Sequence, residues 1–193
     1  RRVANALDAM GLAFGDRVGT LAWNGYRHFE LYFGVSGSGR VMHTVNPRLA
    51  PDQVAWILNH AEDRVLCFDM TFLPIIKGIW QHCPKVEHWV ALCDADALPQ
   101  DTGIKGLSSY EALLAKAGDG YTWPQFDEKS ASALCYTSGT TGRPKGAMLS
   151  HGALAANALA LHKAWGFKEG DVLLHALPIF HVHGLFVATH CAL

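Results

Sequence analysis

The stretch YTSGTTGRPKG at residues 136–146 decides how this 193-residue chain is interpreted. It follows an apolar run, residues 131–136, that predicts a buried strand, so the loop leaves the end of a sheet. Ligands commonly bind at that edge in α/β proteins. Its glycines let the backbone approach a ligand, its serine and threonine hydroxyls can donate hydrogen bonds, and Lys145 adds a positive charge. The stretch therefore predicts a loop that binds phosphate groups.

Two other interpretations of this loop compete with a phosphate-binding loop. An ordinary turn is the simplest, because glycine, serine and threonine are common in loops. A Walker-type phosphate loop requires glycine directly before the lysine and serine or threonine directly after it. Pro144 and Gly146 occupy those positions. This mismatch argues against the P-loop phosphotransferases.

The same residues resemble the signature loop of the acyl-adenylate-forming enzymes, which include the AMP-dependent acyl-CoA ligases. The resemblance implies that the loop holds the β- and γ-phosphates of ATP while a carboxylate attacks the α-phosphate, and that CoA then displaces AMP. It makes Lys145 a catalytic residue. ATP, Mg²⁺ brought with ATP, and CoA as co-substrate are the expected small molecules. The implied phosphate contacts are Thr137, Ser138, Gly139, Thr140, Thr141, Gly142 and Lys145.

A second stretch, LPIFHVHGL at residues 177–185, follows the apolar segment 172–176, which predicts the end of another strand. It is similar to the next motif of that family, where a histidine after an aromatic residue lines the meeting point of carboxylate and α-phosphate. His181 is thereby implied to be catalytic, with Phe180 and His183 as further residues of the substrate pocket. Histidine suits this place because it can donate a hydrogen bond to an oxygen that gains negative charge. The alternative is a histidine at the edge of the core that bonds only the backbone.

Strands and helices alternate along the chain. This alternation predicts an α/β fold with a layered, largely parallel sheet flanked by helices. Residues 94–109 are expected to be a surface connection, and residues 26–28 a polar cluster at the surface. Expected strands are 18–23, 41–45, 64–68, 86–92 and 131–136, with 147–149 short and extended. Expected helices are one at the start of the chain, 26–33, one beginning near 51, 72–80, 109–115 and 151–165. For the last of these, Ser150 is the expected cap and Gly166 the expected stop.

Relative to the resembled family, residues 1–193 are expected to be an incomplete large N-terminal AMP-binding domain, without the C-terminal domain. Such a fragment is expected to be inactive by itself. The composition, 50% hydrophobic and 17% charged with a net charge of −1, fits a soluble enzyme of the cytoplasm. No cluster of basic residues suggests nucleic acid, and no apolar run is long enough for a transmembrane segment.

The histidines and cysteines could be taken for metal ligands. The spacing does not support a metal site, since neither a C-x-x-C pair nor H-E-x-x-H occurs. Cys67, Cys93 and Cys135 lie in apolar runs, which is typical of small buried residues in a reducing compartment. The five cysteines are Cys67, Cys83, Cys93, Cys135 and Cys191.

The acid to be activated is indicated only weakly. Residues 1–137, above all 22–50, resemble medium-chain fatty acyl-CoA ligases, whereas residues 138–193 resemble malonyl-CoA synthetases. A second carboxylate on the acid would need a cationic partner, and residues 177–193 offer only histidines. This favours a monocarboxylic, medium- or long-chain fatty acid. A malonyl-type ligase, an adenylation domain that loads a carrier protein, and a non-catalytic nucleotide-binding fragment remain alternatives, and the chain could be a chimera.

Overall fold

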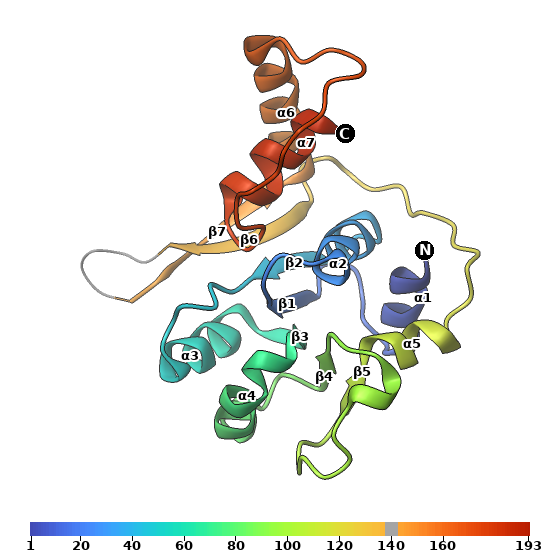
Figure 1. Ribbon diagram of the computed structural model, residues 1–193, viewed down its shortest axis with the longest axis vertical. Coiled ribbons are helices and arrows are strands. Elements are labelled where there is room, and N and C mark those ends of the chain that lie inside the picture. The colour runs from blue at the N-terminus through green and yellow to red at the C-terminus, as the bar shows by residue number, and fades with distance from the viewer. Residues whose placement is uncertain (138–142) are drawn as a thin grey trace.

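A seven-stranded sheet is the centre of the computed structural model, which describes residues 1–137 and 143–193 (Figure 1). The strand order is β5-β4-β3-β1-β2-β6-β7. Strands β1 to β6 run parallel, and β7 is antiparallel to β6. The predicted α/β class with a largely parallel sheet is confirmed. The strands are β1 Arg17–Leu21, β2 Val41–Thr44, β3 Asp63–Phe68, β4 His88–Ala91, β5 Leu107–Ser109, β6 Ala131–Thr137 and β7 Lys145–Ser150.

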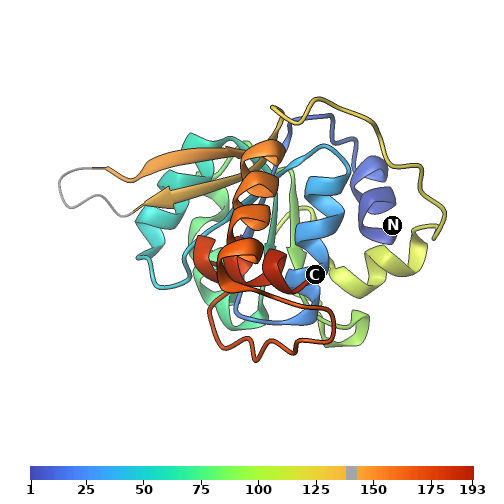
Figure 2. The same cartoon turned by 90° about the horizontal axis from the view of Figure 1, so that it is seen from above.

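Helices cover both faces of this sheet. Helices α1, α2 and α5 pack together on one face, and α3 and α4 pack on the other (Figure 1). Helices α6 and α7 lie beside each other, and α6 also contacts β7 at the edge of the sheet (Figure 2). The helices are α1 Arg2–Ala9, α2 Tyr26–Gly37, α3 Pro51–Ala61, α4 Leu73–Ile79, α5 Tyr110–Lys116, α6 His151–Trp165 and α7 Thr189–Ala192, with a π-helical turn at His183–Ala188.

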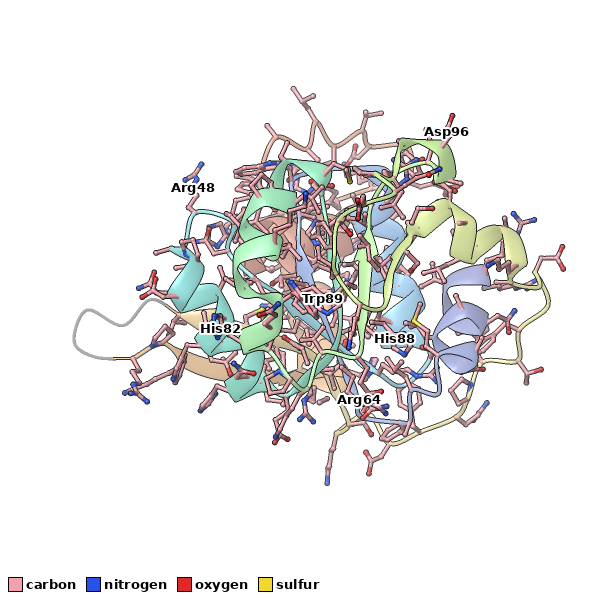
Figure 3. All side chains as sticks on the ribbon, turned by 90° about the horizontal axis from the view of Figure 1, so that it is seen from below. Arg48, Arg64, His82, His88, Trp89 and Asp96 are labelled. Atoms are coloured by element: carbon pink, nitrogen blue, oxygen red, sulfur yellow. The ribbon has the colours of Figure 1, made fainter. Side chains whose placement is uncertain are left out.

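Two apolar cores lie on opposite faces of the sheet, and β3 contributes to both. Val65 and Cys67 belong to the core beneath α1 and α2, whereas Leu66 and Phe68 belong to the core beneath α3 and α4. Successive side chains of a strand point to opposite faces, so a strand covered on both sides is a continuous apolar run. Trp89 of β4 is also buried, and it lies near the middle of the view in Figure 3.

Several local predictions are confirmed at the residue level. Helix α6 begins after Ser150, whose hydroxyl accepts a hydrogen bond from the Ala153 N–H at 3.2 Å. It ends at Gly166, which has the left-handed conformation with φ of 70°. Cys67, Cys93 and Cys135 are buried as predicted, and Cys83 and Cys191 are buried and free as well.

Four local predictions are wrong. Residues 94–109 are not only a connection, because Leu107–Ser109 forms β5 beside β4; three residues are too few to show a periodicity. The helix expected at 26–33 continues to Gly37. Gly34 does not end it but lies inside it, where a Cβ would collide with Val3 of α1. Segment 172–176 is not a strand and exposes its apolar side chains. His28 is buried instead of lying at the surface.

The exposed residues Arg48 and Asp96 lie near the outline of the molecule in Figure 3. Arg64 forms ion pairs with Asp16 at 2.8 Å and Glu87 at 2.6 Å. Across residues 1–137 and 143–193, every helix falls short of the length and apolarity that crossing a bilayer would require.

Candidate active site

A cavity of about 520 Å³ opens at the carboxyl ends of the neighbouring parallel strands β2 and β6. Crevices at this edge are the usual ligand sites of open α/β sheets. The wall combines apolar side chains with hydroxyl, amide and imidazole groups, and none of its described members is Asp, Glu, Lys or Arg. The lining residues are Thr44, Asn46, Leu49, Ile57, Cys135, Tyr136, Thr137, Pro144, Leu177, Pro178, Phe180, His181, Val182, His183 and Gly184.

Strands β6 and β7 hold the two ends of the predicted phosphate loop side by side. Thr137 and Lys145 are paired across the two strands, and the Thr137 hydroxyl donates to the Lys145 carbonyl at 3.5 Å. Thr137 and Pro144 line the cavity, whereas Lys145 is exposed and does not. The other predicted phosphate contacts, Ser138, Gly139, Thr140, Thr141 and Gly142, lie outside the described residues.

Tyr136 fixes the end of β6 beneath this loop. Its hydroxyl lies 2.6 Å from Nδ1 of His60 on α3, and its ring packs against His43 with centroids 5.2 Å apart. Nδ1 of His43 in turn lies 2.7 Å from the Asp63 carboxylate, and both side chains are fully buried. Burial raises the pKa of the Tyr136 hydroxyl above its usual value. The strand that leads into the loop is thus anchored to α3 and β2.

The segment that follows residue 176 forms the opposite wall. Phe180 is buried and packs edge-to-face on Trp23, with ring centroids 5.9 Å apart. The His181 ring lies 4.7 Å from that of Phe180, and the exposed side chains of His181 and His183 line the cavity. The structure therefore brings Phe180, His181 and His183 together with Thr137. His181 is at the cavity surface, not at the edge of the core.

Several lining residues were missed from the sequence. Thr44 and Asn46 lie at and just after the end of β2, and Cys135 and Tyr136 belong to β6. A signal for Thr44 and Asn46 was available, because residues at the carboxyl ends of parallel strands meet at one edge of a sheet. Leu49 and Ile57 of the α3 region carried no such signal.

The described residues bring no three His, Cys, Asp or Glu side chains together in a way that could hold a metal ion. Two of the histidines are hydrogen-bonded to other groups. His175 Nε2 lies 3.0 Å from the Gly184 carbonyl, and His190 Nε2 lies 2.7 Å from the Tyr32 hydroxyl.

A comparison with protein families shows to which family the chain belongs. Residues 1–193, the whole chain, match the family model described as AMP-binding enzyme. The chain belongs to the AMP-binding enzyme family. The predicted resemblance to the acyl-adenylate-forming enzymes is thereby confirmed.

Similar proteins of this family are longer than the chain. It is 46% identical over 195 residues to the 3-methylmercaptopropionyl-CoA ligase of Ruegeria pomeroyi, covering 100% of this chain and 36% of that protein. It is 44% identical over 187 residues to the medium-chain-fatty-acid–CoA ligase of Ectopseudomonas oleovorans, covering 95% and 34%. The crystal structure of ATP-bound MatB from Rhodopseudomonas palustris superimposes with a TM-score of 0.82 at 34% identity, covering 99% and 36%. The chain spans about a third of the length of the relatives it matches, 36% and 34% for the two ligases.

Proposed function

We propose that the protein carrying this chain is an AMP-forming acyl-CoA ligase. The carboxylate of an acid attacks the α-phosphate of ATP, the bond to pyrophosphate breaks, and acyl-AMP forms. The thiol of CoA then takes the acyl group and AMP leaves. Residues 1–193 would form part of the large N-terminal domain of this enzyme. The supporting observation is the cavity that joins Thr137, at the start of the phosphate loop, to Phe180, His181 and His183.

The phosphate end of the cavity is assigned to the β6–β7 hairpin. Its described groups fit a polyphosphate: the Thr137 hydroxyl lines the cavity, and the side chain of Lys145 extends from the adjacent strand. Lys145 supplies a point charge for phosphate oxygens, and the loop between them would supply amides and hydroxyls. Mg²⁺ would enter with ATP, because this ion usually binds substrate phosphates.

His181 is assigned to the point where the acid meets the α-phosphate. An imidazole N–H can stabilise an oxygen that gains negative charge as the carboxylate attacks, and this effect is larger in a cavity than in water. Phe180 is buried against Trp23, and its ring contacts the His181 ring. His181 therefore projects from a fixed wall of the cavity.

The acid is proposed to be a medium- or long-chain fatty acid. Leu49, Ile57, Leu177 and Val182 give the cavity an apolar wall, and its described lining offers no lysine or arginine for a second carboxylate. Both curated relatives are named for acids with one carboxyl group. A malonyl-type ligase is the alternative.

Acid-dependent exchange of pyrophosphate into ATP by the full-length protein tests this proposal. We expect exchange with octanoate and little with malonate. Lys145→Ala should lower exchange roughly 100-fold by removing a phosphate contact, whereas Lys105→Ala, an exposed lysine at the far edge of the sheet, should leave it unchanged.

Exchange with malonate alone would make the enzyme a malonyl-type ligase. ATP binding without exchange for any acid would replace the proposal by a nucleotide-binding module. Equal exchange in Lys145→Ala and the parent would contradict the loop assignment.

A further inference from the structure

Asn24 links two segments that are far apart in the sequence and meet beside the cavity. It lies in the loop between β1 and α2. Its Nδ2 donates to the Leu177 carbonyl at 2.9 Å, 153 residues away, and its Oδ1 accepts from the Ile179 N–H at 2.9 Å. These two residues flank Pro178, which has no N–H to offer. Using both ends of one planar amide fixes the orientation of the 177–179 turn as well as its position.

The loop that carries Asn24 is itself tightly held. The Trp23 N–H donates to Asp69 Oδ2 at 2.7 Å, directly after β3. The Trp23 carbonyl lies 3.0 Å from Nδ1 of the buried His28, whose Nε2 lies 3.0 Å from the Thr20 hydroxyl. Because a carbonyl can only accept, Nδ1 of His28 carries the proton and Nε2 accepts from Thr20. These hydrogen bonds fix the loop that carries Asn24 to β1 and to the carboxyl end of β3.

Side chains reinforce the same connection. The Trp23 ring packs between Phe72, with centroids 5.3 Å apart, and Phe180, with centroids 5.9 Å apart. The His181 N–H donates to the Pro178 carbonyl at 3.2 Å, so the turn held by Asn24 leads directly into His181. The backbone before His181 and the ring beside it both depend on the 23–24 loop.

We propose that Asn24 is a positioning residue for acid activation, which holds the His181 imidazole in place at the cavity through the 177–179 turn. This inference rests on the proposed function. Asparagine suits the role because it presents a donor and an acceptor on neighbouring atoms. An aspartate would keep only the acceptor, and an alanine would leave a carbonyl and an N–H of the turn without their partner.

The test is acid-dependent ATP–pyrophosphate exchange by the full-length protein. Asn24→Ala should lower the kcat of exchange roughly 10- to 100-fold, because small displacements of a reacting group have effects of this size, while KM for ATP changes less than about twofold. Asn5→Ala is the matched control. Asn5 also donates two hydrogen bonds to distant backbone carbonyls, Gly118 at 2.6 Å and Gly120 at 2.8 Å, but away from the cavity. The exchange rate of the Asn5→Ala protein should equal that of the parent.

A second variant protects the test against a loss of folding. Asn24→Asp keeps the acceptor for the Ile179 N–H and the side-chain volume but loses the donor to Leu177. We expect it to fold, as judged by circular dichroism, and to lose roughly 3- to 10-fold in kcat. Unchanged kcat in a folded Asn24→Asp and Asn24→Ala would overturn the proposal.

A double-mutant cycle shows whether Asn24 acts through His181. In a His181→Ala background, Asn24→Ala should cause no further loss, because the group it positions is gone. Multiplicative losses would mean that Asn24 acts by another route and would overturn the inference. If His181→Ala lowers exchange and Asn24→Ala does not, only the positioning role fails. If His181→Ala leaves exchange unchanged, the assigned role of His181 fails as well.

Discussion

Helices α3 and α6 are stabilised in different ways. Five of the 11 residues of α3 are buried, namely Val54, Ala55, Ile57, Leu58 and Ala61. Helix α6 has 15 residues, of which Leu154 is the buried one, and Leu159 on it is 73% exposed. Burial therefore holds α3 in place, whereas α6 depends on its Ser150 cap, its Gly166 stop and its alanine-rich sequence.

The cavity lies between the densely packed region around α3 and the more exposed region that follows α6. One wall comes from the packed strands β2 and β6, and the other from residues 177–184, which follow α6. A few specific contacts, above all those of Asn24 and Phe180, join the second wall to the packed part. We therefore expect stability to depend on the first region and the geometry of the site on the contacts between the two.

The largest effect is expected from a core substitution in the packed region. Trp89→Ala removes a buried indole from β4 and leaves a large cavity, so the free energy of unfolding should fall by about 3–5 kcal/mol. Urea unfolding followed by circular dichroism measures it. Trp165→Ala, on α6 where the side chain is 52% exposed, should cost less than about 1 kcal/mol. Equal losses would contradict the contrast between the two regions.

The second largest effect is the change in stability with pH that is caused by His28. Burial lowers the pKa of His28 from its ordinary 6.5 to about 4, so the folded protein keeps it neutral. Below pH 6.5 the unfolded chain binds a proton that the folded chain does not, and stability is lost as pH falls from about 6.5 towards 4. Between pH 7 and 4.5 His28 should remove about 2 kcal/mol of unfolding free energy.

His28→Gln reveals this contribution, because other groups also titrate in that range. The stability difference between the parent and His28→Gln should shrink by that amount at pH 4.5 in urea titrations. Exposed Asn157→Gln, which changes no titratable group, is the control and should keep a constant difference from the parent. A constant difference for His28→Gln would show that His28 is not buried in its neutral form.

Local signals in the sequence predicted most of the secondary structure. The cap at Ser150 and the stop at Gly166 were both found because each acts within a few residues. Strand β5 was missed because its three residues are specified by pairing with β4. His28 was placed at the surface because it follows Tyr26 and Arg27, although α2 turns it towards Thr20.

The site could be predicted only in part, and only through motif resemblance. Thr137, Phe180, His181 and His183 line one cavity, as the two motifs indicated, while the exposed side chain of Lys145 lies outside its lining. Asn24 could not be found, because an asparagine in a loop ordinarily indicates a turn and its partners lie more than 150 residues away. The roles of Thr137, Lys145, Phe180, His181 and His183 in binding and catalysis remain predictions.

A smaller loss of stability is expected when the serine that caps a helix is replaced, and its size should differ between the two regions. Ser150→Ala removes the acceptor for the Ala153 N–H and should destabilise α6 by about 1 kcal/mol, or roughly fivefold in amide hydrogen exchange. Ser109 makes the same contact with the Ala112 N–H at 3.1 Å, but it is buried. Ser109→Ala should therefore cost more, since the N–H is left without a partner away from water. Equal losses of stability in Ser150→Ala and Ser109→Ala would contradict the difference in burial between the two caps.

The smallest effect is expected on the outer surface of α6. Leu159→Ala should change the free energy of unfolding by no more than about 0.5 kcal/mol in urea titrations, because its side chain is already in water. Leu154→Ala on the same helix removes a buried side chain and should cost about 2 kcal/mol. A loss at Leu159 equal to that at Leu154 would show that this surface is packed.

One experiment decides whether the cavity activates an acid on ATP. Acid-dependent pyrophosphate exchange by the full-length His181→Ala protein is measured beside its affinity for ATP. We predict that the kcat of exchange falls at least about tenfold while ATP affinity changes less than about twofold, because His181 is assigned to the transition state. Equal losses of exchange and ATP affinity, or no loss of exchange, would contradict that assignment.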